Sequence, residues 1–211
     1  MELINLSSIF RDIYNIYNKM EKNIRTYNTE LRKVDGGNGR MVEGTAIVFG
    51  KPSQPLGEAH VIEYIDRSAV TQDVINNSDI FCYLNHDETR GVLARCRYGK
   101  GSLKLDLRDD GLHYSFEAPH TQLGDELLNY LERGEIYTSS FAFCTKKASD
   151  EYSRDEQDRL IRHVTCITRL FDVSPVFEPA YLDTSCSLRK LQDIQETDNK
   201  LNEISKEIDF L

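Results

Sequence analysis

Alternation of hydrophobic and polar residues runs through most of the chain and predicts strands. It is clearest at 136–145, IYTSSFAFCT, where Phe141 and Phe143 fall on one face and Ser140 on the other, because residues two apart in a strand share a face. Shorter runs of the same kind lie at 58–65, 80–86, 91–98, 102–109 and 111–118. The residues DDG at 109–111 are typical of a tight turn and are expected to join the last two runs as a hairpin.

Turn-forming and charged segments divide the rest of the centre. Strand-like residues 23–34 and 41–49 flank the glycine-rich DGGNGR, which predicts another hairpin. Residues 146–158 are rich in charge and predict a mobile loop, after which 159–173 return to a strand pattern. The prolines that follow favour extended backbone.

One segment has the spacing of an amphipathic helix. Thr121 can accept a hydrogen bond as its N-cap, and Gly134 can end it in a left-handed conformation. The predicted buried stripe consists of Leu123, Leu127, Leu128 and Leu131.

The two ends of the chain differ in pattern from its centre. Residues 1–20 show a rough helical period and predict an N-terminal helical arm, and residues 187–211 have the helix propensity of a C-terminal helix or coiled-coil arm. Between them, residues 21–186 predict one mostly β domain. A closed antiparallel β-barrel of about seven strands, with a few helices around it, is the most economical arrangement, because closure removes exposed sheet edges.

Composition and charge argue against several classes of function. The 211 residues carry 35 acidic against 26 basic side chains, which argues against nucleic acid as the main partner because phosphate contacts need a basic face. No apolar run reaches the roughly 20 residues of a membrane span, and the first residues lack the pattern of a secretion signal. We therefore expect no membrane association and no export from the cell.

The five cysteines are dispersed, with no C-x-x-C pair. This spacing is typical neither of a disulfide framework nor of a structural zinc site. Reduced, mostly buried thiols are expected, and no metal or other cofactor is expected to be bound.

Ser140 needs a neighbouring base before its hydroxyl can act as a nucleophile, and without one it is an ordinary surface serine. His86 stands out among the histidines because it ends a hydrophobic run at a strand-to-loop junction, where side chains can reach a cleft. The alternative is a loop histidine bonded to Asp87 or Asn85. The acid that orients the imidazole could be Asp172, unless Asp172 only forms a turn before Val-Ser-Pro.

Five blocks of sequence occur in a characteristic order: VEGTAIVFG, LNHDETRGVLAR, LRDDGLHYSFEAP, LERGEIYTSSFAF and FDVSPVFEPAYLDTS. Together they resemble the prohead (head maturation) protease family of tailed phages, over about Arg25 to Ser185. The resemblance implies a fold similar to that of the herpesvirus assembly proteases. It also implies a serine endopeptidase that cleaves scaffold or capsid-protein segments inside the immature shell.

The resemblance assigns roles to three residues. The family's histidine block falls on His86 as general base, and its Ser-Phe-x-Phe block falls on Ser140 as nucleophile. Its acidic residue before Val-Ser-x-Val falls on Asp172, which would orient the imidazole.

Three further residues are candidates around this triad. Ser139 is a rival nucleophile, because TSSFAF lacks the glycine that relatives often have near the serine. Glu178 is the alternative to Asp172 as third member. The EPAY turn, which contains Ala180, is a candidate source of an oxyanion donor.

The implied partners are the major capsid protein, a scaffold protein or both, as substrates. The implied location is the bacterial host's cytoplasm, inside the assembling prohead, and a homodimer is expected because the herpesvirus enzymes pair through helices. The alternatives are a non-catalytic head-assembly or scaffold-binding component built on the same barrel, and an unrelated hydrolase or ligand-binding barrel. The cleavage motif, and whether the termini are trimmed by the enzyme itself, stay open.

Overall fold

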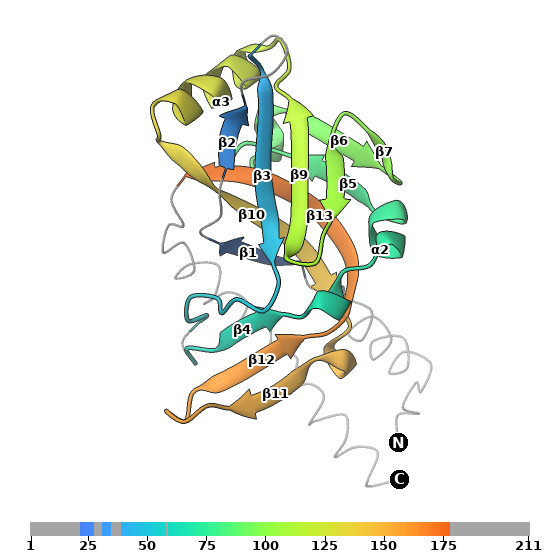
Figure 1. Cartoon of the computed structure of the whole chain (residues 1–211), viewed down its shortest axis with the longest axis vertical. Coiled ribbons are helices and arrows are strands. Elements are labelled where there is room, and N and C mark those ends of the chain that lie inside the picture. The colour runs from blue at the N-terminus through green and yellow to red at the C-terminus, as the bar shows by residue number, and fades with distance from the viewer. Residues whose placement is uncertain (1–21, 28–30, 35–38, 58, 178–211) are drawn as a thin grey trace, which may run out of the picture. The chain divides into compact units, whose positions relative to one another are not determined.

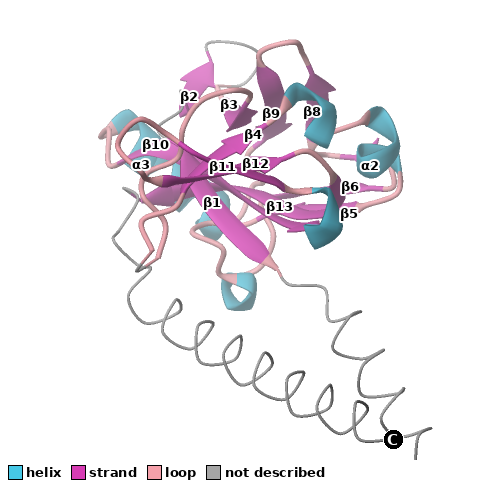
Figure 2. Cartoon of the chain, turned by 90° about the horizontal axis from the view of Figure 1, so that it is seen from below, coloured by secondary structure: helices cyan, strands magenta, loops and turns pink. Residues whose placement is uncertain are grey.

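The computed structural model describes residues 22–27, 31–34, 39–57 and 59–177. The expected helical arms at 1–20 and 187–211, and residues 35–38 of the expected hairpin loop, lie outside these ranges. All described residues fall within one compact unit, Lys22–Ala180. Within it, strands predominate and the helices are few and short (Figures 1 and 2).

The described strands form sheets of six, four and three strands. The six-stranded sheet has the order β1 (Asn23–Tyr27), β10 (Ile136–Thr145), β13 (Ile167–Phe177), β5 (Asp79–Cys82), β6 (Ala94–Arg97), β7 (Lys100–Gly101). The four-stranded sheet has the order β2 (Leu31–Val34), β3 (Met41–Val48), β9 (Gly111–Glu117), β8 (Lys104–Leu107). The three-stranded sheet has the order β11 (Glu151–Arg154), β12 (Leu160–Val164), β4 (Ile62–Ile65). Pairing is antiparallel except between β12 and β4 and between β13 and β5.

The mostly β architecture is confirmed, but the described strands do not close into a barrel. Each sheet keeps two edge strands within the described ranges: β1 and β7, β2 and β8, and β11 and β4. The long, curved β10 and β13 cross behind β3 and β9 (Figure 1). The register between β10 and β13 shifts at three points, and such bulges bend a strand pair and interrupt its ladder. The sheets therefore share a core without forming one continuous ring of hydrogen-bonded neighbours.

Several predicted strands are shorter than expected. The run at 58–65 is a strand only over Ile62–Ile65, because the bonds between Leu56 and Val61 close a loop in which His60 has a φ of 49°. The predicted strand at 159–173 is divided between β12 and β13.

The charged segment 146–158 was predicted to be a loop and instead contains β11, which pairs with β12. All four residues of β11 are exposed. An edge strand without a buried face has no hydrophobic alternation, so the pattern that identifies other strands is missing here.

The predicted helix is α3 (Gln122–Glu132), in which Gly124 N donates to Thr121 Oγ1 at 3.3 Å and Leu127 and Leu128 are buried. A second helix, α2 (Gln72–Asn76), was not predicted; it is capped by Thr71. Single 3-10 turns are formed by η1 (Arg67–Ala69), η2 (Glu88–Arg90) and η3 (Lys147–Ser149).

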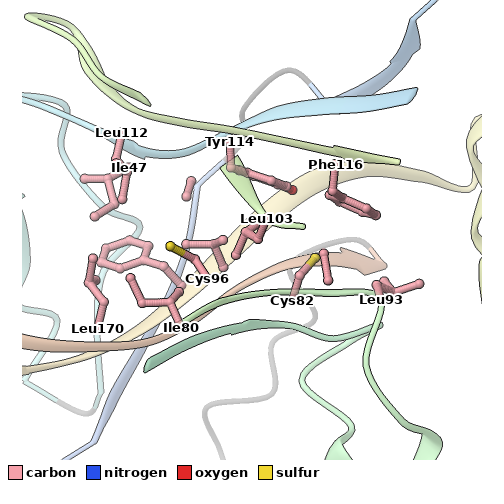
Figure 3. Close-up of a cluster of buried hydrophobic side chains, with 14 of the residues drawn as sticks. Ile47, Ile80, Cys82, Leu93, Cys96, Leu103, Leu112, Tyr114, Phe116 and Leu170 are labelled. Atoms are coloured by element: carbon pink, nitrogen blue, oxygen red, sulfur yellow. The ribbon is translucent and has the colours of Figure 1, made fainter. Parts of the chain in front are cut away.

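The main core lies between the six-stranded and four-stranded sheets (Figure 3). Ile80 and Leu170 from the former face Ile47 and Leu112 from the latter (Figure 3). The predicted inward face of 136–145 is confirmed, because Phe141 and Phe143 are fully buried with their ring centroids 4.9 Å apart. Two cysteines, Cys82 and Cys96, are part of this core, and burial raises the pKa of both thiols.

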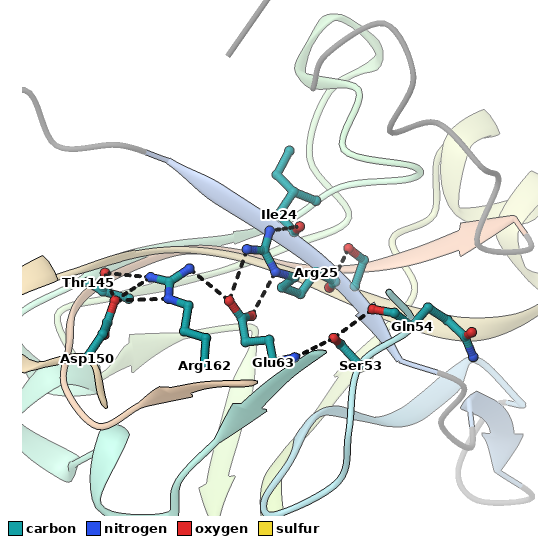
Figure 4. A network of polar contacts seen from close by, with 9 residues as sticks. Ile24, Arg25, Ser53, Gln54, Glu63, Thr145, Asp150 and Arg162 are labelled. Atoms are coloured by element: carbon teal, nitrogen blue, oxygen red, sulfur yellow. Dashed lines mark hydrogen bonds and ion pairs between the residues drawn. The ribbon is translucent and has the colours of Figure 1, made fainter. Parts of the chain in front are cut away.

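A buried network of charges joins the three-stranded sheet to β1 (Figure 4). Glu63 on β4 has a fully buried side chain, and Arg25 on β1 donates to its two carboxylate oxygens at 2.7 and 3.1 Å. Arg162 on β12 donates to Glu63 at 2.9 Å and to Asp150 at 2.5 and 3.0 Å. Each buried charge is therefore compensated by a directly bonded opposite charge.

Replacing Glu63 tests how much this network contributes to stability. Glu63→Ala is expected to lower the free energy of unfolding by about 3–5 kcal/mol, because Arg25 and Arg162 lose the carboxylate that compensates them. Chemical denaturation measures the change. In the matched control Glu135→Ala, which removes a surface pair with Arg133, the change should stay within about 0.5 kcal/mol. Equal effects of the two substitutions would contradict the assigned role of the network.

Gly124 tests the packing at the start of α3. A Cβ there would lie 2.0 Å from the carbonyl oxygen of Pro119, which is backbone and cannot turn away. Gly124→Ala is expected to destabilise the fold by about 1–3 kcal/mol, although alanine favours a helix over glycine by about 1 kcal/mol. The exposed control Asn129→Ala should be neutral within about 0.5 kcal/mol in the same urea titration. Stabilisation by Gly124→Ala would show that helix propensity outweighs the contact.

Candidate active site

Side chains from three separate parts of the chain meet at one face of the six-stranded sheet. Ser140 lies on β10, Asp172 lies on β13, and His86 lies in the loop that follows β5. In the antiparallel β10–β13 pair, Ser140 is opposite Ser174, and Asp172 lies two residues from Ser174 on the same strand. Because paired residues and residues two apart share a face, Ser140 and Asp172 project toward the same side.

His86 connects the other two side chains. Its Nε2 lies 2.6 Å from Ser140 Oγ, and its Nδ1 lies 2.5 Å from Asp172 Oδ1. A neutral imidazole that donates from Nδ1 to the carboxylate has its Nε2 lone pair directed at the serine hydroxyl. This is the tautomer in which a histidine can accept the hydroxyl proton.

An unusual backbone conformation holds His86 in place. Asn85 and His86 have φ values of 56° and 57°, a left-handed conformation that costs a residue with a side chain roughly 1–2 kcal/mol. The bond from Asn85 N to the Pro175 carbonyl, at 2.9 Å, anchors this turn to β13. Asp87, expected as an alternative partner of His86, instead caps η2 by accepting from Thr89 N at 2.9 Å.

Asp172 is buried, with 1% of its side chain exposed. Its Oδ1 accepts hydrogen bonds from His86 and, at 2.9 Å, from Ser174 Oγ. Its Oδ2 lies 3.5 Å from the Lys22 ammonium. A buried carboxylate requires such donors and a nearby cation, so these contacts offset the cost of placing the charge inside the protein. Asp172 is thus a strand residue and does not form the turn that was the alternative.

Ser140 is fully buried, and its hydroxyl has a second acceptor besides His86. The carbonyl oxygen of Arg25 lies 2.9 Å from Ser140 Oγ and is the alternative acceptor for its single proton, because β1 runs antiparallel alongside β10. The side chain of the same Arg25 is held by Glu63. The buried ion pair between Arg25 and Glu63 therefore helps to hold β1 beside the Ser140 hydroxyl.

The other candidate residues are not part of the hydrogen-bonded group formed by Ser140, His86 and Asp172. Ser139 points to the opposite face, where its Oγ lies 2.9 Å from the hydroxyl of Tyr114. Burial raises the pKa of Tyr114, so Ser139 faces a neutral phenol and no base. Glu178 and Ala180 lie outside the described residues. Burial, and then the charge of Asp172, raises the pKa of Cys82, which disfavours a reactive thiolate.

Several residues of the site could not be found by pattern reasoning. Ser174 lies within the FDVSPV block, but nothing in the block distinguishes it from a packing residue. Lys22 and the Arg25 carbonyl come from a segment more than a hundred residues before the strands that they contact. A backbone carbonyl, moreover, has no sequence signature of its own.

Two possible features are not seen in the part of the chain that the structure describes. No group of three His, Cys, Asp or Glu side chains is placed to hold a metal ion there. No helix within the described ranges is long and apolar enough to cross a bilayer.

Comparison with known proteins identifies the family. The family model for the Caudovirus prohead serine protease matches residues 27–200, a range that contains Ser140, His86 and Asp172. The bacteriophage T4 capsid assembly protease gp21 is similar in structure, with a TM-score of 0.48 and 12% sequence identity over 77% of this chain and 100% of that chain. A search of curated proteins finds no match. The resemblance seen in the five sequence blocks is confirmed, and the chain belongs to the Caudovirus prohead serine protease family.

Proposed function

We propose that this prohead protease hydrolyses peptide bonds with Ser140 as nucleophile, His86 as general base and Asp172 as orienting acid. The observation that carries the proposal is the hydrogen-bonded chain from Ser140 through His86 to Asp172, with distances of 2.6 and 2.5 Å. The 2.6 Å between Ser140 Oγ and His86 Nε2 lies within the roughly 2.6–3.2 Å at which a base can take the proton of a serine. The chain of bonds joins residues from three distant segments and contains every group that the reaction needs to activate the hydroxyl.

In the proposed mechanism, the Ser140 hydroxyl directs its single proton to His86 Nε2 and not to the Arg25 carbonyl. His86 removes the proton as Oγ attacks the substrate carbonyl, and Asp172 stabilises the imidazolium that forms. His86 then protonates the leaving amine, and the acyl-enzyme is hydrolysed by water with the same base. Backbone N–H groups are expected to stabilise the oxyanion, and the EPAY segment that contains Ala180 stays the predicted source.

Capsid and scaffold proteins are the substrate class that membership of a prohead protease family implies. We propose that the segments cleaved belong to the major capsid protein, a scaffold protein or both, inside the prohead assembling in the host cytoplasm. A homodimer stays a prediction.

Two substitutions test the nucleophile and the base. Ser140→Ala and His86→Ala are each expected to reduce cleavage of a co-expressed capsid precursor by at least about 1000-fold, because each removes one half of the proton transfer. Peptide mapping of the precursor measures the loss. Ser139→Ala is the matched control and should leave the cleavage products unchanged, since its hydroxyl lies in the core. Normal processing by both Ser140→Ala and His86→Ala would refute the protease mechanism and favour a non-catalytic assembly role.

A further pair of substitutions tests which acid, Asp172 or Glu178, orients the imidazole of His86. Asp172→Asn preserves the shape of the side chain but disfavours the tautomer that His86 needs, so kcat should fall by about 1000- to 10000-fold. Glu178→Gln is the corresponding change at the alternative acid and should keep kcat within about 3-fold of the wild type. Kinetics on a peptide spanning the mapped cleavage site provide the comparison. A larger loss in Glu178→Gln than in Asp172→Asn would transfer the role to Glu178.

A further inference from the structure

We propose that Ser174 is a positioning residue of this active site, which acts on His86 through Asp172; the inference rests on the proposed function of the triad. Ser174 is fully buried on β13, directly opposite Ser140 and two residues after Asp172. Buried polar groups require partners. The Ser174 hydroxyl bonds to Asp172 of the triad and to the backbone amide of Tyr83, which leads to His86.

The first bond fixes the carboxylate. Ser174 Oγ donates to Asp172 Oδ1 at 2.9 Å, and this is the oxygen that also accepts from His86 Nδ1. Within the described residues, Oδ2 accepts no hydrogen bond, and the Lys22 ammonium lies 3.5 Å from it. The terminal torsion of an aspartate is intrinsically broad. A second donor on Oδ1 therefore restricts the rotation that would turn this oxygen away from His86.

The second bond fixes the segment that leads to the base. Ser174 Oγ accepts from Tyr83 N at 3.2 Å. The ladder between β5 and β13 has a single registered pair, Phe81 with Asp172. Beyond it, the Tyr83–Ser174 bond and the bond from Asn85 N to the Pro175 carbonyl continue the alignment up to His86. The Ser174 hydroxyl thus takes the place of a backbone acceptor at Tyr83, the first residue after β5.

The two bonds use the hydroxyl in both of its capacities, since its proton goes to Asp172 and a lone pair receives the Tyr83 amide. One group therefore links the strand that carries the acid to the segment that carries the base. Without it, the buried Tyr83 amide loses its acceptor and Asp172 Oδ1 keeps only His86 as donor. A displacement of about 1 Å between reacting groups can cost about 100-fold in rate, so the loss should appear in catalysis as well as in stability.

The chain contains a matched control at the same pair of strands. Ser78, next to β5, is also buried, and its Oγ accepts from Leu170 N of β13 at 3.2 Å. Ser78→Ala therefore removes the same kind of side-chain-to-backbone bond between the same segments. Within the described residues, its hydroxyl makes no hydrogen bond to Asp172, His86 or Ser140.

The experiment compares Ser174→Ala with Ser78→Ala in the full chain. Both should lower the midpoint of thermal unfolding by a similar amount, roughly 2–6 °C. The second-order rate of labelling by a fluorophosphonate, which bonds to the serine oxygen as fluoride leaves, should fall about 10- to 100-fold in Ser174→Ala and less than about 2-fold in Ser78→Ala. The low-field proton resonance of the His86 Nδ1–H should shift or broaden only in Ser174→Ala.

Equal labelling rates in the two variants, with the His86 resonance unchanged in Ser174→Ala, would overturn the proposal. If Ser174→Ala does not fold, the same labelling comparison is made between Ser174→Cys and Ser78→Cys, because a thiol of similar size is a weak donor. Equal labelling rates in these two variants would also overturn the proposal. Failure of the proposed function gives a different result: the wild type would label no faster than Ser140→Ala. The His86 resonance would then still show whether Ser174 positions the imidazole, because it does not depend on reactivity.

Discussion

The antiparallel pairing of β10 with β13 is the constraint on which the rest of this structure depends. It places Ser140 opposite Ser174, with Asp172 next along the same face. The opposite face of the pair carries Phe141 and Val173, which are fully buried in the core. A slip of one residue would exchange the two faces, so burial of the hydrophobic side chains also fixes where the hydroxyl and the carboxylate point. Core packing and the geometry of the proposed active site are consequently set by the same register.

β1 couples the stability of the fold to the site in a second way. The Arg25 side chain compensates the buried Glu63 carboxylate, while the carbonyl oxygen of the same residue lies 2.9 Å from Ser140 Oγ. Lys22, at the start of this segment, lies near Asp172. Buried ionic groups are costly unless they are well paired, and here the pairing also holds β1 beside Ser140, the proposed nucleophile. The segment is therefore both a part of the sheet and a boundary of the proposed active site.

Much of the fold could be predicted because most strands have one buried face. Alternation located β9, and it located β10 although both faces of β10 are buried over most of its length. Cap and turn residues located α3 and the hairpin between β8 and β9. Hydrophobic alternation did not predict β11, which is fully exposed and has no buried face, and it did not predict the ends of several strands. It also led to a closed barrel, because local patterns identify strands but not the bulges that shift their pairing.

The sequence by itself determined the candidate residues, since the order of the five blocks and the resemblance they carry pointed to Ser140, His86 and Asp172, with Ser139 and Glu178 as alternatives. Only the tertiary structure brought the first three into one hydrogen-bonded chain. It also showed that Ser139 lies in the core and that Ser174 donates a hydrogen bond to Asp172. The physical reason is that these contacts join segments far apart in the chain. Their geometry depends on strand register and on a left-handed turn at His86, neither of which is encoded by the identity of neighbouring residues alone.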